Sequence, residues 1–299
     1  MGGIARHELA AAVSEAGGLG TIGGVRAPIA AEIAAARRLT GRPIAVNLLL
    51  PFVRSGDAEA AAAGDAIVTF WGRPRRLAAN TWIHQCGSVE EAKAAAAAGA
   101  DMVIAQGVEA GGHVRGSTPM LELLERVRAA VNIPVLAAGG LVDAEGVRAA
   151  LDSGATAAVV GTRFLLSDES HAHPDYKQRC LDAGETVLTE LFGFGWPDAP
   201  HRVIPNAATR RWLHGDRRGP RWIRTTNRLA APLARRIPTG AQERAIKRQR
   251  PSQPFLGPQP PTDDGPAALL DSGPLYAGMS VTRVTEIRPA AELVRTLTP

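Results

Sequence analysis

The chain has 299 residues, a formal net charge of +5 at pH 7 and 45% hydrophobic residues, with only 4% aromatic residues. It is long enough for one large α/β barrel or two smaller domains, with a core of Ala, Val, Leu and Ile. It has no run of the roughly 20 apolar residues that a membrane helix needs, no signal-peptide pattern and too few cysteines for a disulfide framework, so we expect a cytoplasmic protein.

From residue 1 to about 165, short apolar runs alternate with alanine-rich amphipathic segments. The apolar runs predict strands at 19–23, 44–49, 66–70, 82–86, 102–106, 134–138 and 157–161. The intervening segments predict helices at 7–16, 29–39, 58–63, 75–79, 89–98, 120–131 and 144–152. Capping residues support two of these helix starts, because Ser88 and Asp143 stand directly before the fifth and the seventh helix.

Strand–helix alternation of this kind predicts a parallel sheet. A closed (β/α)8 barrel needs eight strands, whereas seven are predicted here and the first predicted element is a helix. An open doubly wound sheet also accommodates seven strands, but it usually carries one ligand loop. Several predicted strands here end in glycines, which favours an α/β fold of the TIM (β/α)8 type. We expect this barrel to lack its first strand, through a misassigned or truncated start.

The alternation stops after residue 165. Helices are predicted at 174–183 and 185–192, followed by residues 202–250, which hold 14 Lys and Arg against Asp216 and Glu243. Nucleic acid is not the expected partner of this basic arm, because its aromatic residues are sparse and no zinc, KH or RRM pattern accompanies them. A Pro-rich linker at 251–266 and a helix at 290–297 complete a helical and irregular C-terminal extension.

Paired glycines follow two late predicted strands. Gly139 and Gly140 end the strand at 134–138, and Gly161 and Thr162 end the strand at 157–161. In TIM barrels the loops after the last two strands often bind phosphate through backbone N–H groups. The alternative is that these glycines only turn the chain from strand to helix. Because the two glycine pairs follow the last two predicted strands of the barrel, we favour a phosphate site.

Three polar side chains lie in or after other predicted strands. The amides of Asn47 and Gln85 either bond to backbone or contact a polar ligand, and the residues alone leave both readings open. His113 follows Gly111 and Gly112 just after the strand at 102–106, where an imidazole suits proton transfer near neutral pH. We therefore interpret His113 as a general base.

Other reactive residue types are interpreted as structural. Cys86 lacks a neighbouring base, so a buried structural thiol is expected. His171 and His173 have no Cys, Asp or Glu at ligand spacing, so a surface loop is expected and no metal site is predicted.

Taken together, these motifs resemble the nitronate monooxygenase family, formerly called 2-nitropropane dioxygenases. The resemblance is strongest at the segments 1–3, 16–20, 46–48, 83–86, 107–113, 137–140, 161–164 and 274–278. It implies an FMN-containing TIM barrel that oxidises alkyl nitronates or nitroalkanes with O2 to a carbonyl compound and nitrite. The implied partners are these small molecules, and no membrane association is expected. The resemblance does not decide whether the protein is a homo-oligomer.

The resemblance also implies site residues and domain limits. Residues 1–200 would form the FMN-binding barrel, 201–266 the arm and linker, and 267–299 a segment that packs back on the barrel. His113 would be the catalytic residue. The flavin would contact Met1, Gly2, Gly3, Asn47, Gln85, Gly111 and Gly112 with its ring and ribityl chain, and Gly139, Gly140, Gly161 and Thr162 with its phosphate.

Two departures from the family pattern stand out. Family members have a strand before the Met-Gly-Gly motif, and several have lysine where this chain has Gln85. The closest alternative is an FMN- and NAD(P)H-dependent enoyl-acyl-carrier-protein reductase of the FabK type, which shares the barrel and the Gly-Gly-His pattern. Barrels similar to IMP dehydrogenase rely on a loop cysteine, whereas Cys86 lies in a predicted strand. A non-catalytic flavin or nucleic-acid binder is the third class.

Overall fold

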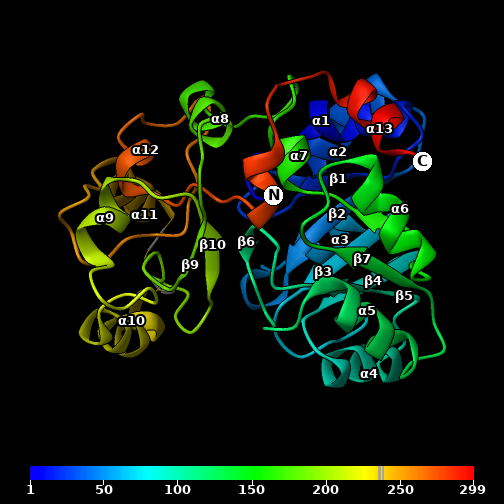
Figure 1. Cartoon of the computed structure of the whole chain (residues 1–299), viewed down its shortest axis with the longest axis horizontal. Helices are drawn as coiled ribbons and strands as arrows, with labels where there is room; N and C mark the ends of the chain where they lie inside the picture. Colours follow the sequence, from blue (N-terminus) through cyan, green and yellow to red (C-terminus); the bar gives the residue numbers. More distant parts are fainter. Residues whose placement is uncertain (235–236, 238) are drawn as a thin grey trace. The chain divides into compact units, whose positions relative to one another are not determined.

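The computed structural model describes residues 1–234, 237 and 239–299. The chain divides into two compact units (Figure 1). The first, called the barrel unit below, comprises Met1–Ala110, Arg115–His171 and Arg283–Pro299. The second unit comprises Gly111–Val114 and Ala172–Thr282. Each unit has its own sheet, so each is described by itself.

The barrel unit contains a sheet of seven parallel strands in the order β1-β2-β3-β4-β5-β7-β8. The strands are β1 (Gly20–Gly23), β2 (Ile44–Leu49), β3 (Ala66–Phe70), β4 (Thr81–Cys86), β5 (Met102–Gln106), β7 (Val135–Ala138) and β8 (Ala158–Val159). All seven predicted strands are present, and sequential strands are neighbours as in a TIM barrel. The parallel α/β prediction is confirmed, with β1 and β8 as the end strands of this order.

Helices alternate with most of the strands in the barrel unit. They are α1 (His7–Glu15), α2 (Ile29–Leu39), α3 (Asp57–Ala61), α4 (Val89–Ala97), α5 (Met120–Arg128), α6 (Ala144–Asp152), α7 (Thr162–Leu165) and α13 (Ala290–Leu297), with a 3-10 turn η1 (Leu50–Phe52). The predicted helix at 75–79 is wrong, because this stretch has no regular structure. In the structure Leu77 is buried and Arg76 Nη2 lies 3.3 Å from Asp101 Oδ2, so tertiary contacts hold this stretch in a non-helical conformation.

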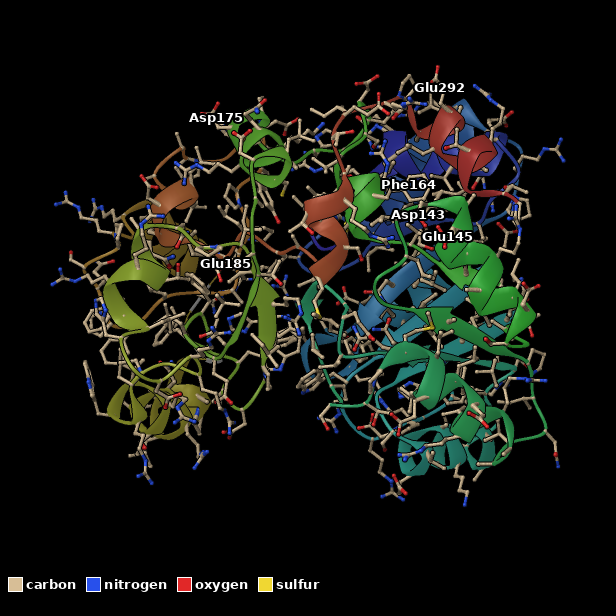
Figure 2. The ribbon with its side chains drawn as sticks, in the orientation of Figure 1. Asp143, Glu145, Phe164, Asp175, Glu185 and Glu292 are labelled. Carbon is tan, nitrogen blue, oxygen red and sulfur yellow. The ribbon has the colours of Figure 1, made fainter. Side chains whose placement is uncertain are left out.

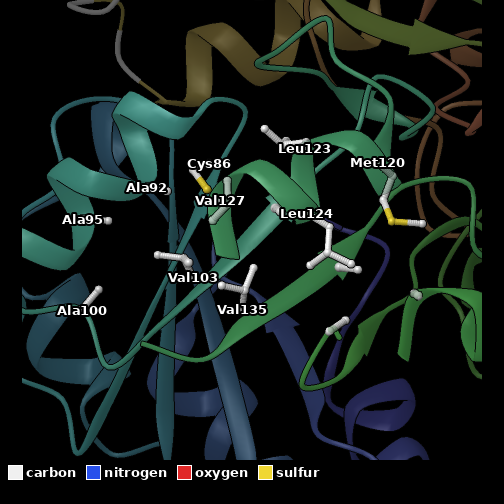
Figure 3. Packing of buried hydrophobic residues seen from close by; sticks show 14 of the residues in the cluster. Cys86, Ala92, Ala95, Ala100, Val103, Met120, Leu123, Leu124, Val127 and Val135 are labelled. Carbon is white, nitrogen blue, oxygen red and sulfur yellow. The ribbon is translucent and has the colours of Figure 1, made fainter. Parts of the chain in front are cut away.

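The two faces of the parallel sheet bury different residues. One face packs against α4 and α5 through Trp82, Cys86 and Val103, in a cluster that Figure 3 shows from close by. The opposite face buries a smaller cluster, which consists of Ala45, Ala66, Val68, Ile83, Ile104 and Ala138. Because successive side chains on a strand point to opposite faces, Asn47 and Gln85 share this second face with Ala45 and Ile83.

The second unit contains a three-stranded antiparallel sheet in the order β6-β10-β9. Its strands are β6 (Gly112–His113), β9 (Val187–Thr189) and β10 (His201–Val203), and its helices are α8 (Pro174–Leu181), α9 (Ala207–Trp212), α10 (Arg221–Ala234), α11 (Thr239–Lys247) and α12 (Leu269–Ser272). The predicted helix at 185–192 is wrong, since β9 lies within it. Val187 and Thr189 are β-branched, and pairing with β10 supplies backbone hydrogen bonds that outweigh a single helical turn.

The described residues of the basic arm at 202–250 include the helices α9, α10 and α11, which its composition did not predict. Several of its arginines form ion pairs with carboxylates. Glu190, which is almost fully buried, is contacted by Arg218 and lies 3.9 Å from Arg224, and Arg228 pairs with Asp198 at 2.5 Å. These arginines therefore contribute to the structure of the second unit. Among the helices in the described part of the chain, none has the length and apolar character required to cross a bilayer.

Gly20 provides a test of the barrel packing. A Cβ added at Gly20 would lie 1.8 Å from the carbonyl oxygen of Ala10, which is backbone and cannot rotate away. We expect Gly20→Ala to lower the free energy of unfolding by at least about 2 kcal/mol through overpacking, measured by urea denaturation. Gly41→Ala is the matched control, because a Cβ there meets nothing within 4 Å. Equal stability of the two variants would contradict the packing of α1 on β1.

Candidate active site

The carboxyl ends of the seven parallel strands lie at one edge of the barrel unit's sheet, where TIM barrels place their active sites. The structure brings nine of the predicted cofactor-binding residues to this edge or to the loops beside it: Met1, Gly2, Gly3, Asn47, Gln85, Gly139, Gly140, Gly161 and Thr162. The remaining predicted site residues, Gly111, Gly112 and His113, belong to the second unit.

The Met-Gly-Gly segment packs against the end of β1. The carbonyl oxygen of Met1 accepts hydrogen bonds from the backbone N–H groups of Ile4 at 3.2 Å and Ala5 at 2.9 Å, and Gly23 N–H donates to Ala5 at 2.9 Å. A Cβ at Gly23 would lie 2.5 Å from the same Met1 oxygen. The chain start is therefore folded tightly onto the carboxyl edge of the sheet. Burial lowers the pKa of its α-amino group.

The two amides differ in how they are held. Asn47 Nδ2 donates to the carbonyl oxygen of Val68 on the neighbouring strand at 3.3 Å. Gln85 is partly buried on the same face of β4 as Ile83 and pairs in register with Phe70 and Ile104. Asn47 is thus partly committed to backbone, whereas Gln85 lies on the interior face with its amide near the carboxyl edge.

His84 lies on the opposite face from Gln85 and has a structural role. Its Nδ1 is 2.8 Å from Thr69 Oγ1, and the same hydroxyl accepts a hydrogen bond from Trp82 Nε1 at 2.7 Å. Burial lowers the pKa of His84 to about 4, so the imidazole is neutral at physiological pH. Of the two neighbouring side chains, only Gln85 is available to a ligand at the interior face.

The two glycine pairs have different surroundings. Gly139 and Gly140 both have left-handed backbone, with φ of 112° and 77°, and a Cβ at Gly139 would lie 3.2 Å from the carbonyl oxygen of Gly107. Gly139 is therefore needed for the close approach of the loop after β5. A Cβ at Gly161 would meet nothing within 4 Å, which leaves open space in front of the Gly161-Thr162 peptide. Both glycine pairs fit a phosphate-binding edge.

The cation that follows Thr162 in the sequence does not point to this open space. Arg163 is buried, and its guanidinium donates to the carbonyl oxygens of Leu166 at 3.2 Å and Glu286 at 3.1 Å. It therefore anchors the C-terminal segment to the barrel unit. Sequence proximity to Gly161 gave no sign of this orientation.

His113 lies in an aromatic environment within the second unit. Its ring stacks on Trp196 at 3.8 Å between centroids and lies 5.2 Å from His201 and 5.5 Å from Tyr276. Burial, and secondarily the neighbouring His201, hold the pKa of His113 well below its usual range. The imidazole is therefore neutral near pH 7, which is the form that accepts a proton.

The side chains that surround His113 were not predicted from the sequence. His201 is fully buried, with Nδ1 donating to Ala199 at 2.9 Å and Nε2 accepting from the N–H of Phe192 at 3.3 Å. Burial lowers its pKa to about 4. Tyr276 Oη donates to the carbonyl oxygen of Pro258 at 2.8 Å. These partners come from distant parts of the chain, so local sequence patterns could not reveal them.

Gly111 is required by the packing of the second unit. A Cβ at Gly111 would lie 2.4 Å from the backbone nitrogen of Gly278 and 2.5 Å from the carbonyl carbon of Ala277. The Gly-Gly-His motif thus lets residues 277–278 pass directly over β6. At Gly112 φ is 73° and a Cβ would meet nothing within 4 Å.

Trp71 is a second feature that sequence analysis missed. It follows β3 at the carboxyl edge with φ of 64°, an uncommon conformation for a bulky residue. Its ring lies 4.7 Å from the guanidinium carbon of Arg115, and Arg115 also pairs with Glu91. The signal available in the sequence was an aromatic residue just after an apolar strand.

Cys86 has the buried structural role that was expected, whereas His171 and His173, which were expected in a surface loop, are partly buried. Cys86 is buried, its thiol donates to Ile104 at 3.3 Å, and burial raises its pKa to about 12. His171 Nε2 lies 2.9 Å from Glu8, and His173 accepts the N–H of Asp175 at the start of α8. In the described part of the chain, no three His, Cys, Asp or Glu residues are arranged to hold a metal ion.

Solved structures identify the fold as that of TIM-barrel enzymes. FabK from Thermotoga maritima has a TM-score of 0.76 with 29% identity, covering 99% of this chain and 90% of that one. Nitroalkane oxidase from Streptomyces ansochromogenes has a TM-score of 0.70 with 30% identity, covering 99% and 92%. A sequence model of nitronate monooxygenase matches residues 1–72 and 74–299, and the chain therefore belongs to the nitronate monooxygenase family.

Curated relatives agree with this assignment. A nitronate monooxygenase of Pseudomonas aeruginosa is 33% identical over 270 residues, with 70% of this chain and 77% of the relative covered. A (3aS,4S,5R,7aS)-5-hydroxy-7a-methyl-1-oxo-octahydro-1H-indene-4-carboxyl-CoA dehydrogenase of Mycobacterium tuberculosis is 32% identical over 234 residues, with 73% of this chain covered. The chain spans only 64% of that relative, and 35% of a probable nitronate monooxygenase of Bacillus subtilis.

The buried histidines predict a pH-dependent stability. His84 and His201 take up a proton near pH 6.5 when unfolded and only near pH 4 when folded. The stability that they contribute is therefore complete above pH 6.5 and falls as the pH drops. By pH 5 each should cost about 2 kcal/mol of the free energy of unfolding, measured by urea denaturation at several pH values.

His84→Gln tests the share of one histidine. Its stability should fall less steeply between pH 7 and pH 5 than that of the wild type, by about 2 kcal/mol, whatever its absolute stability. A stability that does not change between pH 7 and pH 5 in the wild type would show that these imidazoles are not desolvated as described.

Proposed function

We propose that this chain is an FMN-dependent nitronate monooxygenase, which oxidises alkyl nitronates or nitroalkanes with O2 to a carbonyl compound and nitrite. The family match over almost the whole chain supports this class. The observation that favours this activity within the class is the desolvated imidazole of His113, stacked on Trp196. A neutral imidazole can accept a proton, whereas a reductase that protonates its substrate needs a protonated donor.

The residues at the carboxyl edge fit the phosphate end of FMN. Gly139 and Gly140 form a turn in left-handed backbone, and the space in front of Gly161 is open. In the proposal these residues and Thr162 hold the phosphate, while Met1, Gly2, Gly3, Asn47 and Gln85 contact the ring and ribityl chain. When bound, FMN supplies the electron transfer and the reaction with dioxygen.

The protein's own contribution to the chemistry is proton transfer and orientation. With a neutral nitroalkane, the unprotonated ring nitrogen of His113 accepts the proton from the carbon next to the nitro group. The electron pair of that C–H bond moves into the nitro group, so the substrate becomes an anionic nitronate. A substrate supplied as the nitronate needs no such transfer, and the imidazole then only orients it.

The location of the protein is part of the proposal. Cys86 and Cys180 are free and buried, and burial raises the pKa of each thiol to about 12. A chain whose only two cysteines form no disulfide fits a reducing compartment, and we propose the cytoplasm.

Replacement of His113 by alanine tests its role. We expect His113→Ala to lower kcat/KM for a neutral nitroalkane by about 100- to 10,000-fold, the usual contribution of a general base. The rate with the preformed nitronate should fall much less, because no C–H bond has to be broken. Steady-state oxygen consumption with both substrate forms measures this ratio.

The control variant is His214→Ala, which removes an exposed histidine of the same unit and should leave both rates unchanged. Flavin content and circular dichroism establish that His113→Ala is folded and loaded. An equal loss with nitroalkane and nitronate would contradict a role in proton abstraction.

The similarity to FabK favours a second candidate, an FMN- and NAD(P)H-dependent enoyl-acyl-carrier-protein reductase. Anaerobic mixing of the FMN-loaded protein with NADH or NADPH separates the two functions. We expect no rapid bleaching of flavin absorbance with either nicotinamide and full bleaching with a nitronate. Rapid bleaching by a nicotinamide, without bleaching by the nitronate, would favour the reductase.

A further inference from the structure

The loops that form the proposed phosphate edge do not orient a cation towards it. A phosphate monoester carries between one and two negative charges near neutral pH. Arg163, the cation next to Gly161 and Thr162, is buried and donates to two backbone carbonyls of the barrel unit. Its guanidinium is therefore committed elsewhere.

Arg283 lies beside the Gly139-Gly140 turn. It ends the 3-10 turn η2 (Met279–Arg283) and belongs to the barrel unit. Its Nη1 is 3.0 Å from Asp143 Oδ2, and its Nη2 is 3.5 Å from the carbonyl oxygen of Gly140. The side chain is 54% exposed, so part of the guanidinium faces solvent next to this turn.

Asp143 fixes the position of this arginine. Figure 2 labels Asp143 near the start of α6, where Oδ1 accepts the N–H of Gly146 at 2.8 Å and caps the helix. Its other oxygen, Oδ2, is the one that pairs with Arg283. One carboxylate therefore ties the arginine to the helix that follows the Gly139-Gly140 turn.

The backbone after Arg283 is also held in place. The carbonyl oxygen of Glu286 accepts from Arg163 at 3.1 Å, and Arg288 forms a parallel bridge with Ser167. Ala290 N–H donates to both carboxylate oxygens of Glu169, at 2.8 and 3.1 Å. These contacts make the approach of Arg283 to the glycine turn part of the folded barrel unit.

We infer that Arg283 is a binding residue for the flavin phosphate at the Gly139-Gly140 turn, with Asp143 as its positioning residue. The inference rests on the proposed function. A guanidinium has five N–H donors in a planar fork that matches phosphate oxygens, and the two contacts described leave others for an anion. A surface ion pair with Asp143 alone would stabilise the fold by little and would carry no preference for a phosphate.

The test compares two ligands that differ only in the phosphate. Protein freed of flavin is titrated with FMN and with riboflavin, following quenching of flavin fluorescence. Arg283→Gln should weaken FMN binding roughly 10- to 100-fold, as expected for the loss of a charge-assisted hydrogen bond, and should leave riboflavin binding within about twofold. Arg283→Lys, which keeps the charge but loses the fork, should give an intermediate loss.

Arg288→Gln is the matched control, because it removes the same charge from the same segment. Arg288 pairs with Glu286 at 2.6 Å, and its loss should leave the ratio of FMN to riboflavin affinity unchanged. Unchanged FMN affinity in Arg283→Gln, or an equal loss with both ligands, would overturn the inference while leaving the proposed function intact. A wild-type protein that binds neither ligand would instead contradict the proposed function.

Discussion

The pleat of the parallel sheet is the constraint on which the candidate site depends. Along β4, Trp82, His84 and Cys86 face the helices and are fully or almost fully buried, whereas Ile83 and Gln85 face the other side. The second face buries small residues such as Ala45 and Ala138, and the amides of Asn47 and Gln85 lie on the same face nearer the carboxyl edge. A shift of one residue in the register would exchange the two sets and bury the amides under the helices.

The strands of the barrel unit could be predicted from the sequence because their signal is local. Each is a short, mostly apolar run, and β2, β3 and β5 begin and end at the predicted residues. The helix predicted at 185–192 was wrong for a physical reason. Val187–Thr189 is stabilised by a partner strand, His201–Val203, that has no marker in the sequence around it. The helices of the basic arm were likewise not predicted, because the local sequence pattern did not indicate them.

The candidate site also has features that the sequence predicts and features that only the folded structure reveals. The glycines at strand ends are visible in the sequence because a turn at the carboxyl edge needs them there. The orientation of a long side chain is not visible in the sequence. Arg163 stands next to the glycines in the sequence but turns inward, whereas Arg283 is distant in the sequence but lies beside the glycine turn. The neutrality of His113 likewise depends on Trp196 and His201, whose proximity only the fold creates.

The order of segments in the barrel unit has a consequence for synthesis on the ribosome. Residues 283–299 pack with α1, α6 and α7 through Ala290, Leu293 and Leu297, yet they are translated after the whole of the second unit. At about 5–20 residues per second, the nascent barrel waits roughly 5 to 25 seconds for helix α13. Throughout that interval the apolar surface around Leu9 and Val147 is open to chaperones.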